Sequence, residues 1–336
     1  MTSIQDIARR AGVSATTVSH VLNKSRYVHP NTVERVMQAV RELNYKPNMV
    51  ARSLRRRQTH TIGLLVSDIE SPFFTELARS VENTAYERGY NTILCNTDEN
   101  PEKEISYVEV LFAKQVDGLI LAPTPGEHTY LRRYVDDGAK VVFVNRFLPG
   151  FNSPAVIGDD EMIMVKVISH LITQGHRRFG VVIGIESVTT TQNRLLGLKK
   201  ALEMYGLSMA DAWVFPGEAR REGGHRAAKA FISLEKMPTA IITFNSVMHD
   251  GFLLGLLDLA PHLINRLEII GFGYSLAARV RQSAYHYIAQ PTYQIGRIAT
   301  NLLLDAIDKG VPLKAEQIVL ENELVGPVSG EDNGDL

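Results

Sequence analysis

The sequence of 336 residues has a single cysteine, a single tryptophan and no long uninterrupted apolar run. One thiol, Cys95, cannot form a disulfide within the chain, and without a partner histidine nearby it reads as a small core residue. Spanning a bilayer takes about 18 consecutive apolar residues, and no run approaches that length. The helical pattern begins at the first residues, so we expect no signal peptide, no membrane contact and a cytoplasmic location.

The motifs of common enzyme classes are also missing. The sequence has no Gly-x-Ser-x-Gly nucleophile elbow, no phosphate-binding Gly-x-x-x-x-Gly-Lys loop and no His or Cys cluster with metal-ligand spacing. Gly271 and Gly273 lack the third glycine and the strand-to-helix setting of a dinucleotide-binding loop. We therefore predict a protein that is not an enzyme and that needs neither a cofactor nor a metal.

Positive charge is concentrated in the first 60 residues, which hold 11 Lys and Arg against 3 Asp and Glu. Apolar residues recur at helical spacing over Ile4–Ala11, and Gly12 then ends this helix because glycine tolerates a left-handed turn. Ser14 can cap a second helix, and a third follows. Two short helices joined by a Gly-containing turn on a basic segment predict a helix-turn-helix DNA-binding domain over residues 1–46.

Residues 47–60 are expected to form a hinge helix and linker. Val50 and Leu54 lie four residues apart on one face, but a helix of about two turns is marginal alone in water. We expect it to become ordered when a second copy or DNA packs on it. The basic run Arg55–Arg57 is suited to contacts with phosphates.

From residue 61 onward, short apolar strands alternate with helices, and the alternation runs twice. Strands that are apolar throughout predict parallel sheets covered on both faces. The predicted fold is therefore an all-α head joined by a hinge helix to an α/β body of two lobes. The boundaries that we expect are 61–328 for the body, with lobe 1 at about 61–160 plus 291–325, lobe 2 at about 161–290, and a disordered tail at 329–336.

Head and body together resemble the lac repressor family of bacterial transcription regulators over essentially the whole chain. The resemblance rests on an ordered series of short motifs: Ile7–Ser14, Leu43–Asn48, Ser71–Phe74, Val116–Gly118, Gly175–Arg178 and Gln290–Pro291. It implies that the body has the two-lobed fold of periplasmic sugar-binding proteins. It also implies a sequence-specific regulator, most often a repressor, of a carbohydrate catabolic operon.

The resemblance assigns roles in DNA binding to residues of the head and hinge. The family position that commonly holds an Arg is His20 here, so the usual bidentate contact to guanine is lost and a different operator is expected. Leu54 matches an apolar wedge in the minor groove, with packing between paired hinge helices as the alternative. The expected DNA-binding residues are Ser14, Ala15, Thr16, Thr17, Ser19, His20, Asn23, Ala51, Leu54 and Arg55.

The resemblance also implies that a small-molecule effector binds in the cleft between the lobes. Ligands of open α/β sheets bind at the carboxyl ends of the strands. Phe73 and Phe74 match an aromatic platform, with a plain core role for either as the alternative. The expected effector-binding residues are Phe73, Phe74, Arg146, Asp159, Thr190, Arg194, Asn245, Gly273 and Gln290.

Two acids of the family pattern are missing, because Ser246 follows Asn245 and Gly273 stands where an Asp is usual. A pocket that keeps two arginines and loses carboxylates favours an anion, since guanidinium groups pair with carboxylate or phosphate. The prediction is therefore a sugar acid or sugar phosphate. A neutral sugar remains the alternative if Asp68 or Asp159 neutralises the arginines or if Tyr274 replaces the acid, and a nucleoside is a further one.

We predict a homodimer that binds palindromic operator DNA, because one helix-turn-helix unit reads only a few base pairs. Effector binding would change the angle between the lobes and shift the equilibrium between DNA-competent and incompetent states. The sequence leaves open whether the effector releases or promotes DNA binding. A solute-binding protein without a DNA role would have the same body, but it would carry a signal peptide and no helix-turn-helix head.

Overall fold

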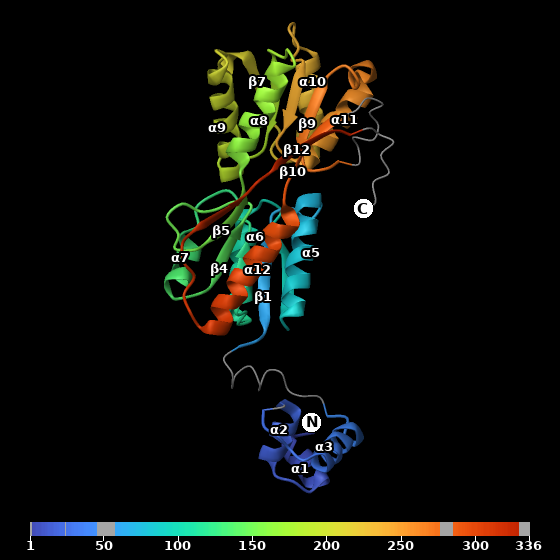
Figure 1. The fold of residues 1–336 in the computed structure, drawn as a ribbon, viewed down its shortest axis with the longest axis vertical. Coiled ribbons are helices and arrows are strands. Elements are labelled where there is room, and N and C mark those ends of the chain that lie inside the picture. Colours follow the sequence, from blue (N-terminus) through green and yellow to red (C-terminus); the bar gives the residue numbers. More distant parts are fainter. Residues whose placement is uncertain (1, 24, 46–57, 276–284, 329–336) are drawn as a thin grey trace. The chain divides into compact units, whose positions relative to one another are not determined.

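The computed structural model describes residues 2–23, 25–45, 58–275 and 285–328. The chain divides into two compact units, Met1–Thr59 and His60–Leu336. Figure 1 shows a small helical unit at the N-terminus and a larger unit built from two sheets. In the described residues, no helix is both long and apolar enough to cross a bilayer.

The described residues of the N-terminal unit form a bundle of three helices, α1 (Ile4–Ala11), α2 (Ala15–Asn23) and α3 (Pro30–Glu42). A reciprocal capping box between Ser3 and Asp6 starts α1, and Gly12 ends it in the left-handed conformation at φ 64°. The inner faces of the helices form one small core, made by Ile7, Ala8, Ala11, Val18, Val21, Val36 and Ala39.

The first lobe of the larger unit contains a six-stranded sheet in the order β11-β5-β4-β3-β1-β2. All of its neighbouring strands are parallel. The strands are β1 (Thr61–Val66), β2 (Asn91–Asn96), β3 (Gly118–Leu121), β4 (Val141–Val144), β5 (Ala155–Gly158) and β11 (Gln317–Leu320). Every residue of β3, β4 and β5 is buried, as the apolar sequence of each strand requires.

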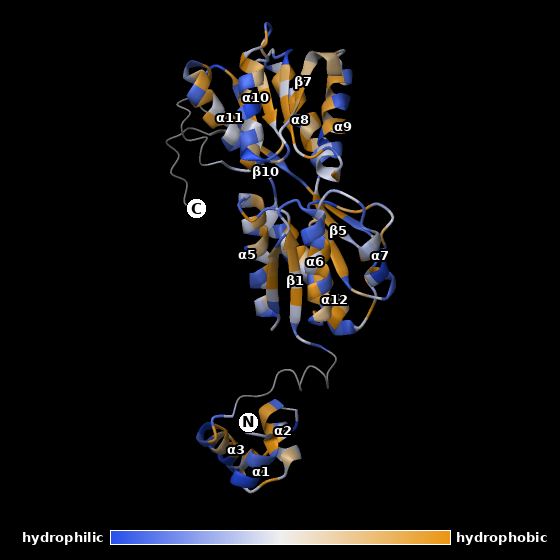
Figure 2. Cartoon of the chain, turned by 180° about the vertical axis from the view of Figure 1, so that it is seen from behind, coloured by the Kyte–Doolittle hydropathy of each residue, from blue (hydrophilic) through white to orange (hydrophobic). Residues whose placement is uncertain are grey.

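Helices cover both faces of this sheet. Side chains of α5 (Pro72–Glu87) and α12 (Thr292–Lys309) share a core with one face, and side chains of α6 (Pro101–Ala113) and α7 (Thr129–Asp136) share a core with the other. Figure 2 shows the corresponding pattern, with apolar strands inside and helices that are apolar on one side.

The second lobe has a six-stranded sheet in the order β12-β10-β9-β8-β6-β7, and only the β10–β12 pair within it is antiparallel. Its strands are β6 (Phe179–Ile183), β7 (Ala212–Pro216), β8 (Ala240–Thr243), β9 (Glu268–Phe272), β10 (Tyr285–Ala289) and β12 (Glu323–Val328). Its helices are α8 (Asp160–Thr173), α9 (Thr189–Met204), α10 (Arg221–Ile232) and α11 (Ser246–Leu259).

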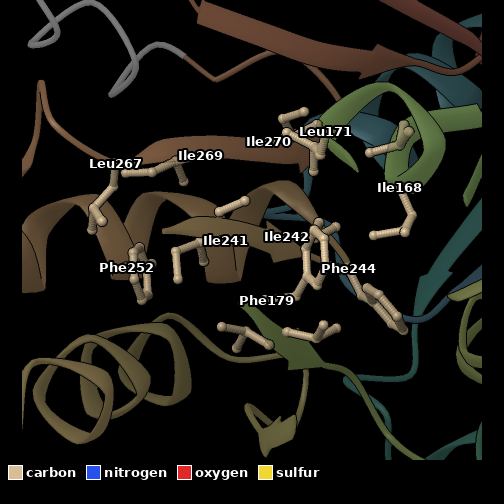
Figure 3. Packing of buried hydrophobic residues seen from close by; sticks show 14 of the residues in the cluster. Ile168, Leu171, Phe179, Ile241, Ile242, Phe244, Phe252, Leu267, Ile269 and Ile270 are labelled. Atoms are coloured by element: carbon tan, nitrogen blue, oxygen red, sulfur yellow. The ribbon is translucent and has the colours of Figure 1, made fainter. Parts of the chain in front are cut away.

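Bulky apolar side chains fill the second-lobe core (Figure 3), among them Phe179, Ile241, Phe252 and Ile270. Helices α10 and α11 approach so closely that a Cβ on Gly224 would lie 2.1 Å from the carbonyl oxygen of Met248. Glycine is therefore required at this helix contact.

The chain crosses between the lobes after β5, after β10 and after β11. The sequence placed residues up to 325 in the first lobe, but β12 begins at Glu323 and pairs with β10 in the second sheet. That boundary was wrong because β12 contains Gly326 and Pro327, which obscure a strand pattern. The predicted tail, residues 329–336, lies outside the described residues.

Candidate functional site

The N-terminal end of α2 is the exposed part of the predicted DNA-reading surface. Ser14, Ala15 and Thr16 are exposed there, whereas Thr17 and Ser19 are half-buried. Ser14 Oγ accepts a hydrogen bond from the backbone N–H of Thr17 at 3.1 Å, which caps the helix. The exposed face of α2 can therefore approach DNA without disturbing the head core.

Two polar side chains further along α2 are held by local hydrogen bonds. His20 Nδ1 lies 2.8 Å from Ser25 Oγ, so a contact between His20 and a base edge would use Nε2. Asn23 Nδ2 donates to the carbonyl oxygen of Ser19 at 2.8 Å, which commits part of its amide to the helix. Tyr27, which was not predicted, is 87% exposed just beyond this helix and is a further candidate for contact with DNA. The predicted hinge contacts Ala51, Leu54 and Arg55 lie outside the described residues.

In the larger unit, a pocket lies at the carboxyl ends of the strands of both sheets. The enclosed space is about 60 Å³. Of the predicted effector-binding residues, the pocket wall includes Phe73, Phe74, Arg146, Thr190, Arg194, Asn245 and Gln290. Residues that were not predicted also line it, namely Ser71, Glu99, Asn145, Gly184, Ile185, Thr191, Ala219, Phe244, Ser246, Val247 and Phe272, together with Asp68, considered only as a possible neutralising acid.

Arg146 is buried and already paired in the first lobe. Its Nη1 and Nη2 donate to the two carboxylate oxygens of Glu99 at 2.8 and 2.7 Å, and Nη1 also donates to the carbonyl oxygen of Pro123 at 3.0 Å. The pairing is bidentate, the geometry that suits a guanidinium and a carboxylate best. Its Nε is buried and has no hydrogen-bond partner among the described residues. Glu99 therefore neutralises the positive charge of Arg146, which was expected to bind an anionic effector.

Arg194 is buried and paired in the second lobe. Its Nε and Nη2 donate to Asp160 Oδ1 at 3.0 and 2.9 Å, its Nη1 donates to the carbonyl oxygen of Phe244, and its guanidinium lies 3.6 Å from the ring centroid of Phe272. Burial raises the pKa of Asp160 and lowers that of Arg194, while their mutual attraction opposes both shifts. An arginine stays charged even so, and the pair is neutral as a whole.

Asp159 and Gly273 do not line the pocket, so the structure differs from the prediction at both. Asp159 lies at a crossover between the lobes, where Oδ1 accepts a hydrogen bond from the backbone N–H of Asn322 at 2.6 Å. The acid that meets Arg194 is the next residue, Asp160, because adjacent positions at the start of α8 point in different directions. Gly273 has φ 85°, a conformation that an aspartate would adopt only with strain.

The aromatic platform is divided between two roles. Phe74 is 6% exposed and packs in the first-lobe core, whereas Phe73 is half-buried. Their rings meet edge to face with centroids 5.1 Å apart. Phe73 therefore offers more of its surface to a ligand, and Phe74 fixes its orientation.

Asp68 adds a second carboxylate to the pocket wall, in addition to that of Glu99. Burial raises its pKa, while a hydrogen bond from the backbone N–H of Glu70 opposes the shift. A signal for Glu99 was present in the sequence, since it follows β2 at the same sheet edge as Arg146. The pairing itself depends on two chain segments 47 residues apart, which no local pattern reveals.

Comparisons with known proteins agree on both units. Residues 3–48 match the family "Bacterial regulatory proteins, lacI family", and residues 59–276 match "Periplasmic binding proteins and sugar binding domain of LacI family". The HTH-type transcriptional repressor PurR of Haemophilus influenzae (strain PittEE) is 35% identical over 316 residues, which are 93% of this chain and 94% of that protein.

Solved structures give the same result. A putative ribose operon repressor from Burkholderia thailandensis is 30% identical with a TM-score of 0.70, over 79% of this chain and 98% of that one. A LacI family regulator from Enterococcus faecium with bound ribose is 25% identical with a TM-score of 0.71, over 79% and 97%. The lac repressor dimer bound to operator and an anti-inducer is 23% identical with a TM-score of 0.83, over 97% and 98%, which shows a common fold.

Proposed function

We propose that this chain responds to an uncharged single-ring sugar bound between its lobes. The chain belongs to the lacI family of bacterial regulatory proteins, and it is a DNA-binding transcriptional repressor rather than an enzyme. The observation that carries the proposal is the pairing of both pocket arginines. Glu99 holds Arg146 and Asp160 holds Arg194, so the cleft has no surplus positive charge among its described residues.

This pairing removes the reason for expecting a sugar acid or sugar phosphate. An anion that paired with the two Nη groups of Arg146 would have to displace Glu99, and it would also meet the carboxylate of Asp68. Both steps cost free energy, because a buried carboxylate that loses its partner or faces a second anion is poorly solvated. A neutral ligand avoids both costs.

The remaining polar groups of the pocket suit hydroxyl groups. Asn145, Asn245 and Gln290 offer amide donors and acceptors, and Thr190 and Ser246 offer hydroxyls. Phe73 provides an apolar surface for the face of a ring. The space of about 60 Å³ is small beside the ~300–1,000 Å³ of ordinary ligand pockets, so one sugar ring requires less opening of the lobes than a disaccharide or nucleoside would.

A thermal-shift and calorimetric panel on the full chain tests the proposal. The ligands are D-ribose, D-gluconate, D-fructose 1-phosphate and hypoxanthine, each with a matched buffer control. A neutral sugar at 100 times its dissociation constant adds about 2.7 kcal/mol of stability. Stabilisation by D-ribose alone supports the proposal, whereas stabilisation only by gluconate or fructose 1-phosphate contradicts it.

A purine base is the second candidate effector. Phe73 can stack on a flat aromatic ring, and the relatives at 35% identity carry the name PurR. Hypoxanthine in the same panel separates the two candidates, since a response to it without a response to D-ribose favours the purine.

We further propose that the chain acts as a homodimer on palindromic operator DNA in the cytoplasm and controls genes of carbohydrate use. One α2 helix has nine residues and can read only a few base pairs, so two heads are needed for a specific site. Analytical ultracentrifugation tests the dimer, and selection of DNA sites from a random pool tests the palindrome. A monomer, or selected sites without twofold symmetry, would contradict this part.

A further inference from the structure

An ion pair next to the pocket wall joins the two lobes directly. Arg220, at the start of α10 in the second lobe, donates from Nη1 to Asp98 Oδ1 at 3.1 Å and from Nη2 to the carbonyl oxygen of Asp98 at 2.9 Å. Asp98 follows β2 in the first lobe. The guanidinium group of Arg220 therefore binds both the side chain and the backbone of Asp98 in the opposite lobe.

Unusual backbone conformations flank this contact on both sides. Asp98 and Glu99 have φ of 58° and 55°, and Glu218 and Ala219 have φ of 56° and 57°. Non-glycine residues rarely adopt positive φ, and such residues cluster where the surrounding structure holds a functional conformation. The two turns bring Asp98 and Arg220 together, and Glu99 and Ala219 from the same turns line the effector pocket.

The charges of the two lobes favour this contact. The turn after β2 presents consecutive carboxylates to two different arginines, because Asp98 binds Arg220 and the next residue, Glu99, binds Arg146. The hydrogen bond from Arg220 is the main reason that the pKa of Asp98 is lowered. The lobes also meet where the backbone N–H of Phe147 donates to Thr189 Oγ1 at 3.3 Å. The two lobes therefore contact each other directly through polar groups.

We propose that Arg220 and Asp98 form a latch that stabilises the closed form of the cleft, and that the turn shared with Glu99 couples its release to the effector pocket. The inference rests on the proposed effector site for its biological role. Effector entry then requires the latch to open, and salt should promote opening, because both partners are partly exposed.

The test measures the opening of the lobes in the full chain without effector. Spin labels are attached at Glu127→Cys in the first lobe and Glu186→Cys in the second, in a Cys95→Ser background, since both glutamates are exposed and Cys95 is the single native cysteine. Pulsed electron–electron double resonance then measures the distribution of distances between the two labels, which reports the separation of the lobes. The matched pair of variants is Arg220→Met, which breaks the latch, and Arg226→Met, which breaks the 2.9 Å pair with Glu218 inside the second lobe.

We expect Arg220→Met to shift the distribution toward open distances by up to about fivefold in the ratio of open to closed forms, the effect of losing one exposed ion pair. Raising the salt from ~0.01 M to ~1 M should shift the unmodified Arg220 protein in the same direction. Arg226→Met should leave the distribution unchanged. Arg220→Lys should be intermediate, because it keeps the charge and loses the fork.

An Arg220→Met distribution that matches the parent protein would overturn the latch, and so would an equal shift in Arg226→Met. Neither result depends on the identity of the effector. If the ligand panel fails while the distances shift as expected, the sugar proposal is wrong and the latch stands. If D-ribose binds while the distances do not shift, the latch is wrong and the effector site stands.

Discussion

Replacing Glu99 by Gln should reverse the charge preference of the cleft. The pair with Arg146 is buried, with side-chain exposures of 9% for Arg146 and 8% for Glu99. Gln has nearly the same shape, but its amide provides one acceptor oxygen where the carboxylate provided two. Arg146 therefore keeps the carbonyl oxygen of Pro123 and one weaker contact, and its charge loses its buried counter-ion.

The size of the effect follows from this geometry. Breaking a buried ion pair by removing one partner costs roughly 3–5 kcal/mol, and the retained amide contact places Glu99→Gln near the lower end of that range. For a domain of this size, each kcal/mol lowers the melting temperature by roughly 2–4 °C, so a loss of about 6–12 °C is expected. An exposed helix residue, Glu109→Gln, is the matched control, because it removes the same charge where the described structure shows no ion pair.

Ligand preference is the sharper part of the prediction. Without the carboxylate of Glu99, the buried charge of Arg146 can attract D-gluconate, so the anion should restore part of the lost stability in Glu99→Gln and none in the parent protein. Thermal melts of both proteins with and without gluconate measure this. The reasoning is refuted if Glu99→Gln has the same melting temperature as Glu109→Gln and if D-gluconate does not raise the melting temperature of Glu99→Gln.

Three further predictions concern other parts of the chain. His20→Arg should move operator preference toward guanine at one position in each half-site, by about 1–3 kcal/mol in competition binding assays. Gly224→Ala should destabilise the second lobe by about 1–3 kcal/mol or more in urea unfolding, because its Cβ would lie 2.1 Å from the carbonyl oxygen of Met248. Burial alone would raise the pKa of Glu104, but hydrogen bonds from His128, Tyr130 and the backbone N–H of Thr124 lower it overall. Its stabilisation is therefore complete above the ordinary carboxyl value of 4.5 and is lost as the pH falls through the lower folded value, and Glu104→Gln should flatten this loss in acidic thermal melts.

The sequence predicted those parts of the fold that local rules govern. The helices of the head follow from apolar spacing, a cap at Ser14 and a left-handed glycine at Gly12. The central strands follow from apolar runs that are buried on both faces. The edge strands β11 and β12 were missed because β11 alternates exposed and half-buried residues and β12 contains a glycine and a proline. Edge strands take their structure from neighbours that are distant in sequence.

The candidate site shows the same division between local and distant information. Arg146, which follows β4, and Arg194, in the second turn of α9, both lie in the pocket wall, and the sequence pattern had pointed to both positions. Their counter-ions were not identified. Glu99, which follows β2, meets Arg146, which follows β4, because both strands belong to one sheet. In the second lobe the sequence pointed to Asp159, but the residue that pairs with Arg194 is its neighbour Asp160. A motif locates a charge, but the three-dimensional contacts decide whether that charge is free.

The location of the ion pairs also indicates how the cleft can open at low cost. Arg146 and Glu99 both belong to the first lobe, and Arg194 and Asp160 both belong to the second, so parting the lobes leaves each pair intact. Next to the pocket wall, opening breaks the contact between Arg220 and Asp98, which water can replace because both groups are partly exposed. A ligand shifts such an equilibrium only by its difference in affinity for the two forms. Opening the cleft therefore costs the protein little free energy. A neutral sugar that contacts both lobes then needs few hydrogen bonds to control the angle between them.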